Sequence, residues 1–95
     1  MLNDRKKRVL QAIVEEYVNT AEPVSSSSLV NNYGLDFSSA TIRNEMAELE
    51  KMGFLDKTHT SSGRIPSEKG YHYYVETIMK ERNNVDYNFP MIDEI

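Results

Sequence analysis

Residues 38–55 contain the feature that most constrains the fold, namely a helix with a defined start, one apolar face and a defined end. Ser38 or Ser39 can cap its start, because a short hydroxyl accepts a hydrogen bond from the first free backbone N–H groups. Three apolar side chains recur at helical spacing and indicate one buried face: Ile42, Met46 and Leu49. Gly53 is typical of the residue that ends a helix in the left-handed conformation. We therefore expect a helix from Ser39 to Met52.

The opposite face of this helix is unusual in its first turns. It carries small residues and hydrogen-bond donors: Ala40, Thr41, Arg43, Asn44 and Ala47. Arg and Asn side chains read base edges, while hydroxyls bind phosphates. The pattern predicts a recognition helix that enters a major groove N-terminus first, although an ordinary capped surface helix has similar features. The candidate DNA contacts on this helix are Ser38, Ser39, Thr41, Arg43 and Asn44.

The preceding residues predict two further helices. The first begins at Asn3 or Asp4 and is ended by Glu22-Pro23-Val24, because Pro23 disfavours helix at Glu22. Its apolar stripe is Val9, Leu10, Ile13, Val14, Tyr17 and Val18. One of the serines 25–28 should cap a short second helix that ends at Gly34, although the serine run could instead be a flexible linker. Together with the helix at 39–52, these elements form a helix-turn-helix arrangement.

After Gly53 the pattern becomes that of a β-hairpin. Residues 54–58 predict a strand, 59–63 a polar loop and 64–66 a return strand, with Pro66 at an edge. A hairpin in this position is called a wing, so the expected fold is mainly α with a small β-hairpin, a winged helix-turn-helix. The tip offers groups suited to phosphate or minor-groove contact: Thr60, Ser61, Ser62, Gly63 and Arg64. A generic polar loop is the alternative.

A fourth helix should follow the hairpin, capped by Ser67. Its apolar stripe is Tyr71, Tyr74, Val75, Ile78 and Met79, which is more typical of a buried face than of a ligand cage. The pattern stops near Asn84. We therefore expect a winged-helix domain at 1–83, followed at 84–95 by a connector or the start of a further domain.

The net charge of −4 is unusual for a DNA-binding domain, which is expected to be basic. Three of the fifteen acidic residues follow Asn83, so twelve acidic and eleven basic residues remain in the rest of the chain. The run from Arg5 to Arg8 adds local positive charge, although it could be a plain solvated helix end. A winged helix used only for protein contacts would explain the acidity and is the main competing hypothesis.

Several function classes are disfavoured by composition. Cysteine is absent, and the two histidines, His59 and His72, lie in different elements, so neither a metal site nor a cofactor is expected. Glu15 and Glu16 are adjacent and point in different directions on a helix, and no phosphate loop or nucleophile motif occurs. An enzyme is therefore not expected. No apolar run approaches a membrane span and no signal peptide is evident, which favours a cytoplasmic protein without a membrane partner.

Three motifs in this order resemble the N-terminal winged-helix domain of the heat-inducible transcription repressor HrcA family. They are Glu22-Pro23-Val24, then Ser38 to Met46, then His59 to Ser67 followed by Gly70-Tyr71 and Tyr73-Tyr74-Val75. The resemblance covers residues 1–80 and implies a bacterial repressor of heat-shock chaperone operons. Such a repressor would bind an inverted-repeat DNA operator (the CIRCE element) as a homodimer, with the GroE chaperonin as modulator. In this resemblance the recognition helix is Ser39–Met52 and the wing is Thr58–Pro66.

Two departures from the family pattern affect these expectations. A basic residue is expected at position 27, where this chain has Ser27, so one phosphate contact is expected to be missing. Family proteins are also several times longer and continue with a dimerisation domain. We therefore expect this chain to be a fragment that lacks the dimerising and chaperonin-sensing parts.

Overall fold

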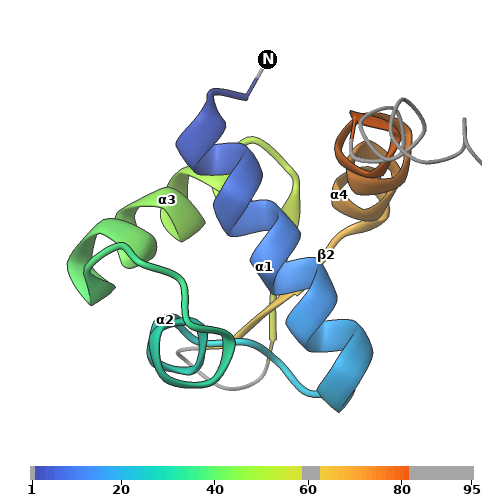
Figure 1. Ribbon diagram of the computed structural model, residues 1–95. Coiled ribbons are helices and arrows are strands. Elements are labelled where there is room, and N and C mark those ends of the chain that lie inside the picture. Colours follow the sequence, from blue (N-terminus) through green and yellow to red (C-terminus); the bar gives the residue numbers. More distant parts are fainter. Residues whose placement is uncertain (1, 59–62, 82–95) are drawn as a thin grey trace, which may run out of the picture.

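The computed structural model describes residues 2–58 and 63–81, and within them the chain is mostly helical with one small hairpin (Figure 1). Its elements are α1 (Asp4–Thr20), α2 (Ser26–Ser28) with its π-helical continuation η1 (Leu29–Tyr33), α3 (Ser39–Lys51), β1 (Leu55–Lys57), β2 (Arg64–Pro66), and α4 (Glu68–Tyr73) with its π-helical continuation η2 (Tyr74–Met79). In Figure 1, α1 crosses the molecule, with α3 and α2 on one side and α4 on the other. The predicted winged helix is confirmed.

Helix α1 begins as predicted and ends earlier than predicted. Asn3 caps its start by accepting a hydrogen bond from the Lys6 N–H at 2.9 Å. Its end is set by Ala21, which adopts the left-handed conformation (φ 59°) and donates to the Tyr17 carbonyl. The stop is therefore not Pro23. Val18 was expected in the core but is 61% exposed, because the last turn of α1 extends beyond the other helices.

The two helices of the helix-turn-helix have the predicted caps. Ser25 accepts from the Ser28 N–H at 3.2 Å, so the serine run starts a helix and is not a linker. This second helix, α2 with η1, ends at Gly34, whose φ of 81° is readily adopted only by glycine. Ser38 then caps α3 by accepting from the Thr41 N–H at 3.1 Å. The helix ends at Lys51, one residue earlier than predicted.

The wing is a two-stranded antiparallel sheet in which Leu55 is paired with Pro66 and Lys57 with Arg64. Phe54 was expected in the first strand but precedes it. A third segment joins the hairpin, because the N–H and carbonyl of Val24 both bond to Arg64, at 2.8 and 2.9 Å. One residue is too short to show the alternation of apolar and polar residues that predicts a strand, so this third segment was not predicted from the sequence.

The core lies between α1, the helix-turn-helix and α4. Its largest fully buried side chains come from α1, η1, α3, β1 and the segment before α2: Leu10, Ile13, Leu29, Ile42, Leu49, Leu55, Val9, Val14 and Val24. The buried face predicted for α3 is confirmed, because Ile42, Met46 and Leu49 belong to this core.

Helix α4 is only partly as predicted. Tyr74 and Ile78 are buried, but three other members of the expected apolar stripe are exposed: Tyr71, Val75 and Met79. The expected stripe was too wide, because α4 packs on the domain along one narrow side. The approach is close at Gly70, where an added Cβ would overlap the Phe54 carbonyl oxygen.

Candidate nucleic-acid interface

The outer face of α3 presents the two side chains with the strongest base-reading chemistry. Arg43 and Asn44 are both exposed, and Ala40 and Ala47 beside them are exposed and small. Among the described residues, Arg43 forms no ion pair. The inner face of the same helix is fully buried at Ile42 and Leu49. The helix is therefore fixed by one face and leaves the guanidinium of Arg43 and the amide of Asn44 accessible on the other.

The hydroxyls at the start of α3 serve first as a cap. Ser38 accepts from the Thr41 backbone, and its Oγ lies 3.0 Å from the Thr41 Oγ1, to which it donates. Ser38 is exposed, whereas Ser39 and Thr41 are half-buried. The helix start also carries the positive end of the helix dipole, which favours a negatively charged group such as a phosphate. The predicted contacts of α3 thus lie together at its N-terminal half.

The tip of the wing cannot be placed in the same way. Thr60, Ser61 and Ser62 lie outside the described residues, as does His59. Gly63, at the edge of this gap, is buried, and its carbonyl accepts a hydrogen bond from the Thr58 hydroxyl at 3.3 Å. Contacts of the four predicted tip residues 60–63 with DNA stay predictions.

Arg64 lies in a different environment from the exposed wing-tip position that the sequence suggested. Its side chain is only 16% exposed, and its Nε donates to Glu50 Oε1 on α3 at 2.9 Å. Its Nη1 also donates to the Gly63 carbonyl at 3.1 Å. The guanidinium therefore connects the base of the wing to the recognition helix, and its charge is already compensated by a carboxylate.

The sequence analysis did not identify Glu45, a buried acid on the recognition helix. Glu45 is 6% exposed, and its carboxylate pairs with two residues of α1: Arg5 at 2.8 Å and Lys6 at 3.0 Å. Its spacing from Ile42 and Leu49 places it on the core side of α3. An acid at such a position needs a basic partner, and the run from Arg5 to Arg8 was the available signal.

The two partners shift each other's pKa in the expected directions. The hydrogen bond that Lys6 donates to Glu45, with charge attraction from Glu45 and Glu48, outweighs burial and raises the pKa of Lys6 above its ordinary value. Burial alone would raise the pKa of Glu45, but the hydrogen bonds from Lys6 and Arg5 outweigh it and lower the pKa. Both groups therefore stay charged at neutral pH, and the ion pair holds the recognition helix against α1.

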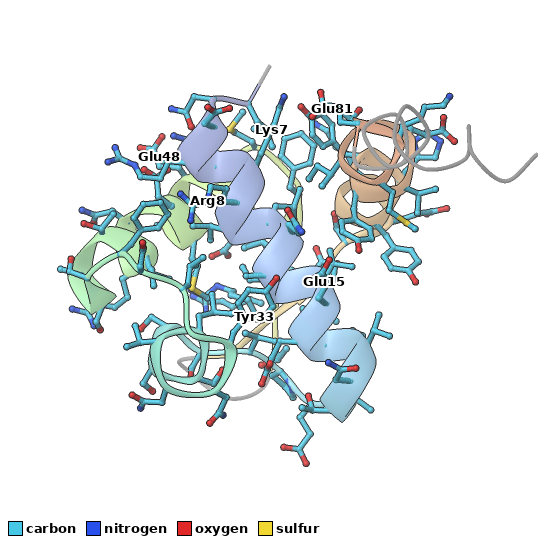
Figure 2. All side chains as sticks on the ribbon, viewed as in Figure 1. Lys7, Arg8, Glu15, Tyr33, Glu48 and Glu81 are labelled. Carbon is cyan, nitrogen blue, oxygen red and sulfur yellow. The ribbon has the colours of Figure 1, made fainter. Side chains whose placement is uncertain are left out.

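The basic run at the start of α1 is mostly engaged within the domain. Beyond the pairs with Glu45, Lys6 lies 3.6 Å from Glu48 and Lys7 lies 3.4 Å from Glu81 at the end of the described chain. Figure 2 shows Lys7 and Glu81 between α1 and α4, and Arg8 on the side of α1 that faces α3. The Arg8 guanidinium lies 4.9 Å from the ring centre of Phe37, just before the α3 cap.

Within residues 2–58 and 63–81, no group of three or more histidine, cysteine, aspartate or glutamate side chains could hold a metal ion. In the same residues, no helix has both the length and the apolar character that crossing a bilayer requires.

Comparison with known proteins agrees with the geometry. The family model described as "Winged helix-turn-helix transcription repressor, HrcA DNA-binding" matches residues 1–80. Relatives named heat-inducible transcription repressor HrcA are 54% identical over 89 residues in Caldanaerobacter subterraneus and 58% identical over 82 residues in Symbiobacterium thermophilum. These matches cover 94% and 86% of this chain, but only 26% and 24% of the relatives.

The fold is also found in a solved structure. A crystal structure of a hypothetical protein superposes with a TM-score of 0.76 at 48% sequence identity, covering 83% of this chain and 25% of that one. The chain thus spans about a quarter of the length of the proteins it matches. The chain belongs to the HrcA family of winged helix-turn-helix transcription repressors, and the match lies in the family's DNA-binding domain.

Proposed function

We propose that this chain binds duplex DNA sequence-specifically and acts as the DNA-binding part of a repressor of heat-shock chaperone operons. The observation that carries the proposal is the exposed pair Arg43 and Asn44 on a helix that is capped, buried on its other face and held to α1 by an ion pair. A preorganised helix of this kind can place both side chains in a major groove. The family match supports the same reading.

The proposed contact set is divided between two elements. On α3 it comprises Ser38, Ser39, Thr41, Arg43 and Asn44, of which the hydroxyls and the helix start contact phosphates and Arg43 and Asn44 contact bases. On the wing it comprises residues 60–63. Arg64 is assigned a different role, because its guanidinium already pairs with Glu50; it sets the position of the wing relative to α3.

The resemblance to the family supports further proposals for the longer protein. We propose that it works as a homodimer on an inverted repeat, with the GroE chaperonin as modulator, in the cytoplasm. Residues 1–83 would then form the DNA-binding domain, and 84–95 the connector to the rest. Neither an enzymatic activity nor a cofactor is part of this proposal.

The test is a binding titration of the 95-residue chain on a duplex that carries the inverted-repeat CIRCE operator. A duplex of the same composition in scrambled order is the control for non-specific binding, and both are measured across a salt series. Specific binding predicts a higher affinity for the operator at every salt concentration, since the electrostatic contribution of the phosphates is common to both duplexes. Equal affinity for the two duplexes would refute base reading.

A module for protein contacts only is the second candidate. Two exposed apolar side chains favour it. Val18 near the end of α1 and Tyr71 on α4 border one open hollow of about 410 Å³. Absence of any binding to either duplex at low salt would support this candidate over DNA binding.

A further inference from the structure

The carboxylate of Glu15, in the middle of α1, is shared by two tyrosine hydroxyls from different parts of the chain. Tyr33 donates to Oε1 at 2.6 Å and Tyr74 donates to Oε2 at 2.9 Å. The side-chain amide of Gln11, one turn earlier on α1, also donates to Oε2, at 3.2 Å. Hydrogen bonds to an ionised group are about twice as strong as neutral ones, so these contacts fix the two rings firmly.

The two tyrosines belong to elements with different tasks. Tyr33 is the last residue of η1, directly before Gly34, where the chain turns toward the recognition helix. Figure 2 shows Glu15 and Tyr33 next to each other, where α1 meets the second helix. Tyr74 is the first residue of η2, in the helix that leaves the domain on the other side of α1. One carboxylate therefore links the helix-turn-helix to α4.

The remaining contacts of α4 make this link important. Within the described part of α4 and η2, most of the apolar stripe is exposed, and Tyr74 and Ile78 are the buried hydrophobic side chains. Tyr73, the residue before Tyr74, is partly buried and packs edge-on against the ring of Phe54, so Glu15 adds a polar contact to the apolar packing that holds this helix. A shift of α4 would move Tyr74, and through Glu15 the shift would reach Tyr33 and the turn before α3.

We propose that Glu15 is a positioning residue for DNA binding, which makes the placement of the recognition helix depend on the placement of α4. The inference rests on the proposed DNA-binding function and adds a coupling between α4 and the reading surface. Glu15 does not touch DNA in this scheme. It acts through Tyr33, because the turn at Gly34 and the cap at Ser38 follow within five residues.

The test removes one hydroxyl far from the DNA face. Tyr74→Phe keeps the ring and removes the hydroxyl that donates to Glu15. We expect this variant to bind the CIRCE operator about threefold to tenfold more weakly than the wild type at a temperature where both are fully folded by circular dichroism. Tyr71→Phe is the matched control, since it lies on the same helix with an exposed side chain, and it should bind like the wild type.

A double-mutant cycle identifies Glu15 as the link. If both hydroxyls act through Glu15, the affinity losses of Tyr33→Phe and Tyr74→Phe are not additive, and neither substitution has a further effect in a Glu15→Gln background. Additive losses that persist in that background overturn the proposal. A lowered melting temperature of Tyr74→Phe with unchanged operator affinity also overturns it, because the bond would then be structural only.

The wild-type titration separates this inference from the proposed function. A wild-type chain without preference for the operator refutes both. A wild-type chain that prefers the operator, together with a Tyr74→Phe variant of equal affinity, refutes the coupling alone.

Discussion

At the residue scale, α3 carries two side chains of opposite charge that point to opposite sides of the helix. Arg43 faces outward, whereas Glu45, two positions later, faces inward and meets Arg5 and Lys6. Two positions correspond to about half a turn of a helix, so the two charges lie on different sides. The acid is thereby paired inside the domain, and the positive side chain is the one that α3 leaves exposed.

The first prediction concerns Arg43. Arg43→Ala should weaken operator binding by about 1–3 kcal/mol more than it weakens binding to the scrambled duplex, because a bidentate contact to a guanine discriminates among bases. Titration of both duplexes by fluorescence anisotropy measures the difference. Lys51→Ala is the control, a loss of the same charge at the exposed C-terminal end of α3. Equal losses on both duplexes would mean that Arg43 contacts phosphate only.

The second prediction concerns how the free energy of unfolding changes as the pH falls. The lowered pKa of Glu45 means that its contribution is present above the pKa of the unfolded chain and is lost as the pH falls through the folded value. The free energy of unfolding of the wild type should therefore exceed that of Glu45→Gln at pH 7, and the gap should narrow toward pH 3. Urea denaturation at both values measures this gap.

Glu48→Gln serves as the control for Glu45→Gln, because Glu48 also lies near Lys6 but its side chain is 58% exposed. Its substitution should leave the pH dependence close to that of the wild type. The raised pKa of Lys6 works in the opposite range: its contribution is present below the unfolded pKa and is lost as the pH rises through the folded one. A constant gap between the wild type and Glu45→Gln across the acid range would contradict the assignment.

At the element scale, the sequence predicted what local rules determine. The caps and the stops at Gly34 and Gly53 each depend on a few neighbouring residues. Ser67 and both stops occur as predicted, and the caps expected among serines 25–28 and at Ser38 or Ser39 are Ser25 and Ser38. What failed depends on packing between distant segments. Too many residues were expected on the buried face of α4. Periodicity shows which residues share a face, but it does not show how much of that face another element covers.

The missed contacts of the candidate interface have the same origin. Pairs such as Arg64 with Glu50 and Arg5 with Glu45 are separated by 14 and 40 positions and follow no short motif. Arg64 illustrates the consequence. Its place in the sequence suggested a contact between the wing tip and DNA. In the structure its guanidinium lies beside α3 and forms an ion pair with Glu50. For Arg43 and Asn44, by contrast, the spacing of the apolar residues along the helix was enough to predict that both side chains are exposed.

The third prediction tests the packing of α3 through Leu49. Leu49→Ala should cost about 2–5 kcal/mol of the free energy of unfolding, because it leaves a cavity in a fully buried site. Urea denaturation measures the loss. Met52→Ala is the control on the same helix end, where the side chain is partly exposed, and it should cost less than half as much. Equal costs would show that α3 is not anchored by its inner face.

The fourth prediction tests the wing through Arg64. Arg64→Ala should lower the free energy of unfolding by about 1–3 kcal/mol, because Glu50 and the Gly63 carbonyl lose a charged donor. The slope of operator affinity against salt should stay that of the wild type, since a guanidinium that neutralises no phosphate releases no counterion, whereas the loss of one phosphate contact would change the slope by about 0.9. A salt series on the operator measures the slope, and a clear flattening would return Arg64 to the DNA interface.

At the scale of the whole molecule, charge and size set the affinity. A chain with a net charge of −4 gains little from general attraction to DNA, so the proposed binding depends on local contacts on α3 and the wing. The relatives are about four times as long, and a second DNA-binding domain held nearby would raise the local concentration at the other half-site.

The fifth prediction follows from the higher local concentration that a second, linked domain provides. Two copies of the chain joined by a flexible Gly/Ser linker should bind the two-half-site operator about a hundredfold more tightly than one copy does. Scrambling one half-site should remove the gain, and anisotropy titrations on the two duplexes measure it. A gain that survives the scrambling would come from general attraction and not from paired recognition.

The bond pair between Val24 and Arg64 has a consequence for the order of folding. It joins residues 40 positions apart, so the chain must close a long loop before the bonds can form. The turns of α1 and α3 need only local contacts and can form earlier. We therefore expect the surface shared by α3 and the wing to be completed after these helical turns, so that a nascent or partly refolded chain has helices before it has a whole binding surface.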